Sequence, residues 1–237
     1  MHQSSYPSGS PAPSLTELIE HSTWGRGLSA IELNRVLDTT STRSVPANTP
    51  AVQAGEASQH WIGVIDGLLK MSVGRPDGRV STLTGVARGG WFGEGSLLKR
   101  EAFRYDVVAL RDSHIALLPR ATFEWLRSHS LAFNHYLQHL LNARLGLFIG
   151  LLENDRLLGA EARVARCLAS LYNPDLYPEP GPYLDLLQSE VALLAGISRQ
   201  TANRALGHLA DLELISLESR GITILDVERL RNFEVAA

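Results

Sequence analysis

The segment VALLAGISRQTANRALGHL, Val191 to Leu209, has the pattern of two helices joined by a tight turn. Gly196 has no Cβ, so it can take the positive φ that ends the first helix. Ser198 stands where a hydroxyl caps the second helix, and the small Ala192 lets the two helices cross closely. The segment therefore predicts a helix-turn-helix.

The second of these helices has two different sides. At about 100° per residue, the side that would pack consists of Thr201, Ala202, Ala205, Leu206 and Leu209. The opposite side carries Arg199, Gln200, Asn203, Arg204, Gly207 and His208. Arginine, glutamine and asparagine are the side chains best suited to base edges in the major groove. A solvated helix face is the alternative, but the pattern favours DNA binding.

The residues that follow predict a β-hairpin. Two apolar runs, Leu212–Leu217 and Gly221–Leu225, flank the turn-like segment Glu218–Gly221. Two helices followed by such a hairpin form a winged helix, and Arg220 at the hairpin tip can contact phosphate.

The charge of this region limits how it can bind DNA. The chain has a net charge of −3, and from Gly159 onward it has 7 Arg, no Lys and 11 Asp plus Glu. Non-specific affinity scales with the phosphates neutralised, so it should be weak. The basic footprint must be local, at Arg199, Arg204 and Arg220. We therefore expect direct contacts to bases and two copies acting together.

The remaining composition is that of a globular protein. The 237 residues suffice for one large or two modest domains, and no apolar run approaches the roughly 18 residues that span a bilayer. We expect residues 1–14, rich in Ser and Pro, to form a disordered tail and no signal peptide. The single Cys167 lies in a helical pattern and is expected to be buried. These features predict a cytoplasmic protein without a membrane partner.

Residues 15–121 form a first predicted domain. Helical spacing between Thr16 and Asp38 precedes short segments with strand-like composition. The expected strands are Trp61–Ile65, Leu68–Val73, Val80–Thr84, Val107–Leu110 and His114–Leu118. Asp66-Gly67 and Asp77-Gly78 mark hairpin turns, so a barrel or sandwich is favoured over a parallel sheet.

Residues 122–158 predict one long helix. Its apolar residues are spaced 4, 4, 3 and 4 apart, which resembles a coiled-coil seam: Leu137, Leu141, Leu145, Phe148 and Leu152. Leu145–Leu152 is apolar nearly all round, as expected of a helix covered by a partner helix and by the β-domain. An ordinary core helix of a monomer is the alternative. A helix over Glu161–Leu171 and a proline-rich loop over Tyr172–Pro182 then lead into the helix-turn-helix.

This order of elements resembles the Crp/Fnr-type transcription factors over Leu15 to Phe233. The most specific stretches are Gly89–Leu98 (GGWFGEGSLL) and Ile197–Arg204 (ISRQTANR). The resemblance implies an α+β fold with a cyclic-nucleotide-binding-type β-roll (a jelly roll) at 15–121, a dimerisation helix at 122–158 and a winged helix at 159–237. It also implies a homodimer on a palindromic DNA site with half-site centres about 34–36 Å apart. RNA polymerase is a further implied partner, and the protein is not expected to be an enzyme.

The resemblance also assigns the DNA contacts. They fall on Ser198, Arg199, Gln200, Thr201, Asn203 and Arg204, and Arg220 of the hairpin joins them on the grounds of its charge and position. Carried over, Arg199 donates to a guanine, and Arg204 reaches a guanine or a phosphate. Many members have glutamate where this chain has Gln200; glutamate accepts from cytosine, whereas glutamine pairs well with adenine. We therefore expect a half-site shifted from that of cyclic-AMP regulators.

The β-roll of the family carries a phosphate-binding cassette, which Phe92-Gly93-Glu94 and Arg104 resemble. Gly93 would let the backbone approach a ligand, Glu94 would accept from a ribose hydroxyl, and Arg104 would neutralise a phosphate. N–H groups around Ser96 at a helix start would help.

Three departures weaken a cyclic-nucleotide assignment. Tyr105 replaces a small hydroxyl residue, Gly95 replaces an aliphatic one, and Leu147–Gly150, with Phe148, offers no hydroxyls. A nucleotide-like ligand, another small effector and no effector all stay open, and in the last case Glu94 and Arg104 would pair with each other. The candidate effector pocket is Gly93, Glu94, Gly95, Ser96, Arg104, Tyr105 and Phe148.

Other kinds of chemistry have weaker support. His135 and His139 lie four residues apart, with His129 nearby, but no carboxylate or cysteine accompanies them, so no metal site is predicted. A cyclic-nucleotide-binding module that acts through protein contacts would combine an intact cassette with no DNA-contacting helix, the reverse of what the sequence shows. The sequence contains no metal cluster, phosphate loop or nucleophile elbow of an enzyme.

Overall fold

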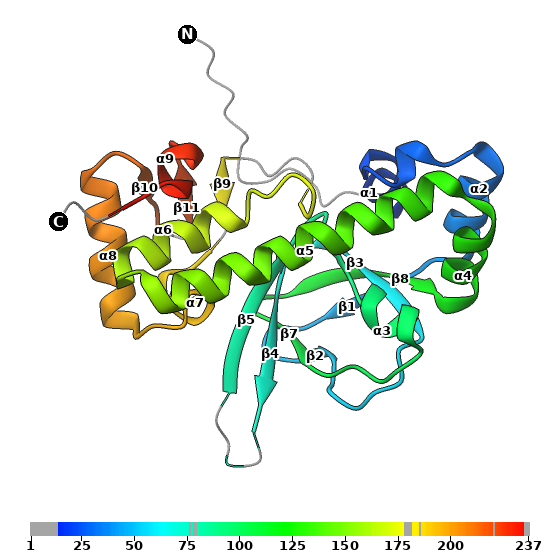
Figure 1. Ribbon diagram of the computed structural model, residues 1–237, viewed down its shortest axis with the longest axis horizontal. Helices are drawn as coiled ribbons and strands as arrows, with labels where there is room; N and C mark the ends of the chain where they lie inside the picture. Colours follow the sequence, from blue (N-terminus) through cyan, green and yellow to red (C-terminus); the bar gives the residue numbers. More distant parts are fainter. Residues whose placement is uncertain are drawn as a thin grey trace, which may run out of the picture.

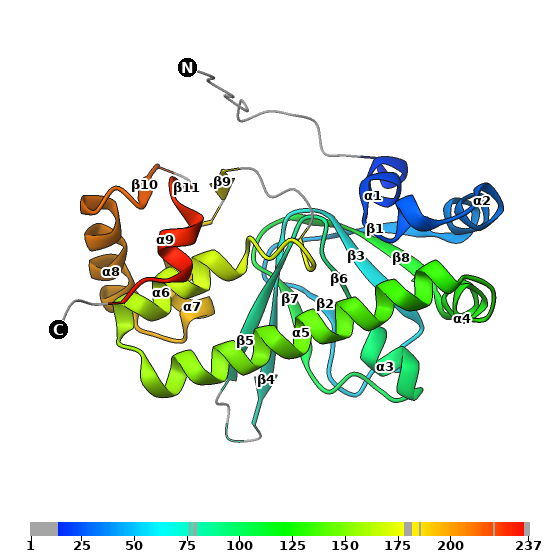
Figure 2. The same cartoon turned by 45° about the horizontal axis from the view of Figure 1, so that its top comes forward.

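The computed structural model describes residues 14–75, 77, 80–177, 182–184, 186–219 and 221–234. A long helix, α5 (Leu131–Leu157), runs along the length of the molecule (Figure 1). The N-terminal helices gather at one end of α5, the C-terminal helices gather at the other, and the strands lie along its side (Figures 1 and 2). Among the described helices, none is long and apolar enough to cross a membrane.

The N-terminal segment forms two α-helices rather than one continuous helix. They are α1 (Leu15–His21) and α2 (Ala30–Thr39), with the short 3₁₀ turn η1 (Gly25–Gly27) between them. Ser29 begins α2 with a capping box, because its hydroxyl accepts from the Glu32 backbone while the Glu32 carboxylate accepts from the Ser29 backbone.

Two four-stranded antiparallel sheets form the expected β-roll. One has the order β1-β8-β3-β6 and the other the order β2-β7-β4-β5. The strands are β1 (Ser41–Val45), β2 (Pro50–Val52), β3 (His60–Asp66), β4 (Leu68–Gly74), β5 (Val80–Ala87), β6 (Trp91–Phe92), β7 (Asp106–Ala109) and β8 (Ser113–Pro119). The five predicted strands are confirmed as β3, β4, β5, β7 and β8. The turn at Gly67 has the expected positive φ of 103°, whereas the turn predicted at 77–78 lies partly outside the described residues.

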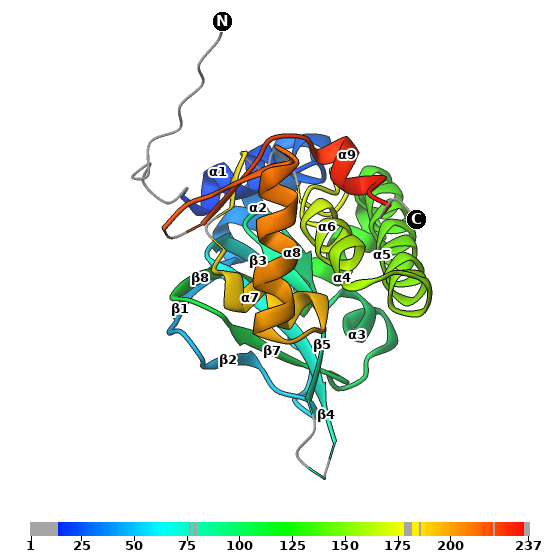
Figure 3. The same cartoon turned by 90° about the vertical axis from the view of Figure 1, so that its left-hand side faces the viewer.

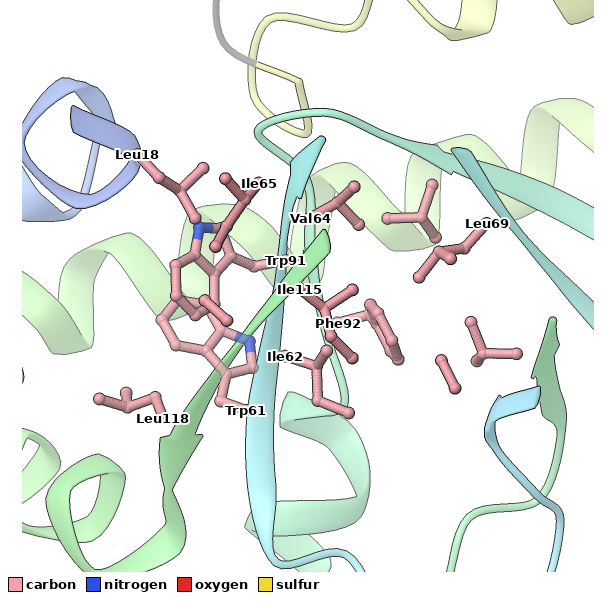
Figure 4. Packing of buried hydrophobic residues seen from close by; sticks show 14 of the residues in the cluster. Leu18, Trp61, Ile62, Val64, Ile65, Leu69, Trp91, Phe92, Ile115 and Leu118 are labelled. Atoms are coloured by element: carbon pink, nitrogen blue, oxygen red, sulfur yellow. The ribbon is translucent and has the colours of Figure 1, made fainter. Parts of the chain in front are cut away.

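An aromatic cluster fills the β-roll beside α5 (Figure 4). The rings of Trp61 and Trp91 lie 4.4 Å apart, and Trp24 lies 5.1 Å from each of them. A Cβ at Gly63 would lie 2.7 Å from the Trp91 ring, so only glycine lets the two strands carry this stack. Phe133 of α5 packs edge-on against Trp24 and Trp61, and this contact anchors the N-terminal half of α5 to the roll.

The long helix predicted at Thr122–Leu158 is wrong at its start. The structure has α4 (Arg120–His129) and then α5, separated at Ser130. Ser130 has extended backbone angles, and its hydroxyl accepts from Phe133 N at 3.3 Å, so it caps a new helix. The long helix therefore begins at Leu131, and α4 packs on the β-roll instead.

The C-terminal part is a winged helix with one more strand than expected. Its helices are α6 (Ala160–Ser170), α7 (Gln188–Ala195), α8 (Arg199–Asp211) and α9 (Val227–Arg231). The predicted hairpin is β10 (Ile215–Leu217) with β11 (Ile222–Ile224), and β9 (Tyr183–Leu184) pairs with β11 as a third strand. The view along the long axis brings α8 to the front of the molecule (Figure 3).

Candidate nucleic-acid interface and β-roll site

The helix-turn-helix has the local geometry that its sequence predicts. Gly196 ends α7 with a φ of 64°, which is the left-handed region. Ser198 begins α8, and its hydroxyl accepts from Thr201 N at 3.1 Å. Ala202, Ala205, Leu206 and Leu209 are buried, so the predicted apolar side packs into the domain.

The other side of α8 is open to solvent. Arg199, Gln200, Asn203 and Arg204 are all exposed, and within the described part of the chain no ion pair or side-chain hydrogen bond engages them. Ser198 and Thr201 differ from these four, because their hydroxyls lie 2.8 Å apart and hold the start of the helix. Four side chains are therefore free to contact bases, and two residues position them.

The described residues of the wing are those of β10, of β11 and of most of the turn between them. Arg220, the predicted phosphate contact, lies outside them. Beside it, the Glu218 carboxylate accepts from the Thr223 hydroxyl, and Glu218 N donates to Gly221 O at 2.9 Å. His208, at the C-terminal end of α8, lies 2.8 Å from Glu161 of α6. These contacts stabilise the domain and add no positive charge near α8.

The β-roll site centres on Glu94 at the start of α3 (Glu94–Lys99), whose N-cap is Gly93 with a φ of 97°. Glu94 is 3% exposed, and its Oε1 accepts from Nε of Arg144 at 2.8 Å. Nη2 of Arg144 donates to the Trp91 carbonyl at 2.6 Å. Burial opposes the charge on Arg144, but Glu94 favours it, and the pKa of Arg144 lies above its usual value. Arg144 was not among the residues predicted for this site, because it lies 50 positions from Glu94 in the sequence.

Glu94 does not pair with Arg104, which was the arrangement considered for a β-roll without an effector. The Arg104 side chain is 75% exposed and pairs with Glu101 at 3.0 Å. Arg104 lies after α3 at the surface, three residues from Glu101, and it pairs with that neighbour. Glu94 is buried and pairs with Arg144 instead.

The Tyr105 side chain is half-buried beside Glu94 and Phe103. Its ring packs edge-on against Phe103 with centroids 5.9 Å apart. Burial, with a further contribution from Glu94, raises the pKa of Tyr105 to about 12, so its hydroxyl stays protonated. Among the other predicted pocket residues, Ser96 is buried, while Gly95 and Phe148 are half-buried.

These residues fit only one end of a cyclic nucleotide. Oε2 of Glu94 is buried and has no hydrogen-bond partner among the described residues, so it could accept from a ribose hydroxyl. The phosphate end lacks its cation, since Arg104 lies in solvent and Arg144 is committed to Glu94 and Trp91. Phe148 cannot hydrogen bond to a base. The site as arranged does not fit the whole group.

Two polar contacts tie the C-terminal domain to the β-roll. The Tyr177 hydroxyl, from the segment after α6, donates to Gly85 O of β5 at 2.6 Å, and the side chain is buried. Nη2 of Arg111 lies 2.6 Å from the Glu190 carboxylate of α7. We call these two contacts the interdomain contact. None of these four residues was predicted from the sequence, because each lies far along the chain from its partner.

The predicted dimer seam is present in part. Leu141, Leu145, Ile149 and Leu152 lie on one side of α5 and are 39–59% exposed; we call them the α5 stripe. Leu137 was expected on this seam, but it is 4% exposed and belongs to the β-roll core, so it cannot contact a partner helix. Phe148 is half-buried at the edge of the stripe.

Three residues, His135, His139 and Cys167, were considered for metal binding and for reactivity. His135 and His139 are exposed, and no group of three or more metal-binding side chains occurs among the described residues. Cys167 is buried in the core of the C-terminal domain, as expected. Burial raises the pKa of its thiol to about 12, so it is not a nucleophile near neutral pH.

The chain is similar to two protein families and to several curated proteins. The cyclic nucleotide-binding domain family matches residues 42–130, and the Crp-like helix-turn-helix domain family matches residues 162–233. The cyclic AMP receptor protein of Thermus thermophilus is 31% identical over 194 residues, which cover 81% of this chain and 87% of that protein. A CRP-like cAMP-activated global transcriptional regulator of Mycobacterium tuberculosis is 29% identical over 180 residues, 74% of this chain and 80% of that protein.

A solved structure supports the fold. FixK2 from Bradyrhizobium japonicum superposes with a TM-score of 0.69 at 18% identity, covering 84% of this chain and 98% of that one. The sequence relatives are transcription regulators and not enzymes. The chain therefore belongs to the Crp/Fnr family of transcription regulators, with a cyclic nucleotide-binding-type β-roll and a Crp-like helix-turn-helix DNA-binding domain.

Proposed function

We propose that this chain is a sequence-specific regulator that binds a palindromic DNA site as a homodimer in the cytoplasm. The observation that carries the proposal is the exposed side of α8, where Arg199 and Arg204 have no ionic partner in the described part of the chain. Gln200 and Asn203 stand beside them and can each form paired hydrogen bonds with adenine. Arginine pairs with guanine in the same way, so the four side chains can distinguish base pairs.

A second copy of the chain is the proposed partner of the α5 stripe. The stripe leaves four large aliphatic side chains in contact with water on a helix that runs the length of the molecule. Because about half of each side chain is already covered, burying the rest would contribute about 1 kcal/mol per residue. A symmetric α5 pair would also place two α8 helices on one duplex, about 34–36 Å apart. RNA polymerase as a further partner rests on the family resemblance.

Selection of bound DNA from a random pool, followed by affinity measurements on the selected site, tests the proposal. Arg199→Ala should cost about 1–3 kcal/mol at one guanine position, because it removes one bidentate contact. The matched control is Arg229→Ala, which removes the same charge from an exposed residue of α9. Gln200→Glu should change the preferred base at one step.

The two arginine variants separate base contacts from general charge. Base contacts require that Arg199→Ala lose discrimination at one position while Arg229→Ala keeps it. An equal loss of affinity for both variants on every DNA sequence would contradict the proposal, since it would mean that only phosphates are contacted.

Control by an effector in the β-roll is the finer part of the proposal. Glu94 offers one free acceptor atom, Oε2, while its Oε1 holds Arg144 of α5. An effector that draws Glu94 away from Arg144 would loosen α5 from the β-roll at this point, and α5 leads directly into the C-terminal domain. Isothermal titration with cyclic AMP, cyclic GMP and cyclic dinucleotides tests for it; saturable heat with one ligand per chain supports an effector, and no heat with any of them contradicts these ligands.

A further inference from the structure

A cavity of about 310 Å³ lies on the other side of α5 from the α5 stripe. Its walls come from the C-terminal half of α5, from α6, from the segment after α6 and from Arg231 of α9. Neither Glu94 nor Arg104 lines it, so it is separate from the β-roll site. It is the place where the long helix, the first helix of the C-terminal domain and its last helix meet.

We propose that this cavity binds a small organic anion through Arg166 and Arg231. Nε of Arg166 is buried, and it has no hydrogen-bond partner among the described residues. No hydrogen bond or ion pair within the described residues engages any other nitrogen of Arg166, so its guanidinium has no partner there and lines the cavity. A carboxylate or phosphate offers two oxygens, which match the fork of a guanidinium.

The charges that line the cavity favour an anion. Arg166 and Arg231 contribute two positive charges, and Asp175 contributes the one negative charge among the lining residues. Arg231 already pairs with Glu228 at the surface and is 42% exposed, so Arg166 provides the deeper contact.

Neutral polar groups complete the set of hydrogen-bonding atoms. Oδ1 of Asn173 accepts from Asp175 N at 2.9 Å, so its amide NH₂ remains a donor. Ser170 donates its hydroxyl to Cys167 O at 2.7 Å and keeps its acceptor capacity. The cavity can therefore accept an anion that also carries a hydroxyl.

Two glycines of α5 leave the space open. A Cβ built at Gly146 or at Gly150 would meet no atom within 4 Å. At about 100° per residue, the α5 residues that line the cavity are centred roughly 180° from the α5 stripe. A partner helix on the stripe therefore leaves the cavity accessible.

Binding there would join three elements that otherwise meet around a void. The ligand would contact α5, α6 and α9 together, so it would fix the C-terminal domain relative to the long helix. The existence of the site does not depend on the proposed DNA binding, because binding is measured without DNA.

The test uses the full chain with inorganic phosphate, succinate and citrate at constant ionic strength. Thermal unfolding and isothermal titration should show saturable binding of at least one of the three to the unmodified protein. Arg166→Gln should weaken the dissociation constant at least tenfold, because it removes the deeper guanidinium. Arg156→Gln is the control, since it removes the same charge from an exposed residue of α5 outside the cavity.

Gly150→Leu is the second variant, and it keeps both arginines. Its side chain should fill the open space and abolish binding while the fold is retained, so it tests the cavity even if Arg166→Gln does not fold. Phosphate against succinate and citrate distinguishes the two head groups. The proposal is overturned if the unmodified protein binds none of the three, or if all four proteins respond equally, which would be a general salt effect.

Discussion

Arg144 carries a positive charge into the β-roll, where its side chain is 14% exposed and Glu94 is its ionic partner. Removing one member of a buried ion pair leaves the other charge without compensation. We expect Arg144→Met to lower the free energy of unfolding by about 3–5 kcal/mol, measured by denaturant titration. The double variant Glu94→Gln, Arg144→Met should recover much of this loss.

Arg104→Met is the control for this residue pair. Arg104 is exposed and pairs only with the surface residue Glu101, so its replacement should change the free energy of unfolding by less than about 1 kcal/mol. Similar losses for Arg104→Met and Arg144→Met would mean that the ion pair with Glu94 does not stabilise the β-roll.

Residue roles could be predicted from the sequence where they depend on near neighbours. Gly196 and Ser198 act within three residues of their own positions, so the turn and the cap followed directly from residue type. Glu94 binds a residue 50 positions away, and the sequence contains no local signal for that distance. Arg104, the partner considered for Glu94 in a β-roll without an effector, pairs with its near neighbour Glu101 instead.

At the scale of elements, α5 is defined by two faces with different partners. Its N-terminal half packs on the β-roll through Phe133, Leu137 and Leu140, while the α5 stripe faces water. The spacing of apolar residues predicted the stripe. It could not separate Leu137 from the stripe, because a helix that is apolar nearly all round does not show which face its own chain covers.

The α5 stripe makes a prediction about assembly. We expect the unmodified protein to sediment at twice the 25.9 kDa mass of one chain, and Leu145→Glu with Ile149→Glu to sediment as a monomer. Two carboxylates placed in an apolar helix pair would be desolvated without partners. Analytical ultracentrifugation measures the mass, and His139→Glu, exposed on α5 and away from the stripe, should leave it unchanged. Dimers that survive the double substitution would place the interface elsewhere.

Apolar strands and strands beside a recognisable turn were predicted, whereas β1, β2, β6 and β9 were not. The strands β3, β4 and β8 each have seven residues and a largely apolar composition. Only Val45 of β1 is buried, and β6 and β9 have two residues each, so these strands exist through their pairing and not through their own sequence. The break at Ser130 was hidden because a serine is as common inside a polar helix face as at a cap.

The whole molecule has two apolar cores, and each contains side chains from the other domain. Leu176 and Tyr177 follow α6 in sequence but are buried in the β-roll core, and Leu68 of β4 is buried in the core of the C-terminal domain. A Cβ at Gly85 would lie 3.3 Å from Leu194 of α7, so the two domains meet closely at β5. Such mutual burial predicts that the domains unfold together.

Weakening the interdomain contact should therefore separate their unfolding. We expect the unmodified protein to show one calorimetric transition, and Tyr177→Ala with Arg111→Met to show two. Tyr177→Ala removes a buried ring from the β-roll core, and Arg111→Met leaves Glu190 of α7 without its ionic partner. Arg88→Gln, at an exposed residue directly after β5, is the control and should retain one transition. One transition at a lower temperature in the double variant would mean that the apolar contacts around Gly85 are enough to couple the domains, and that the two polar contacts only add stability.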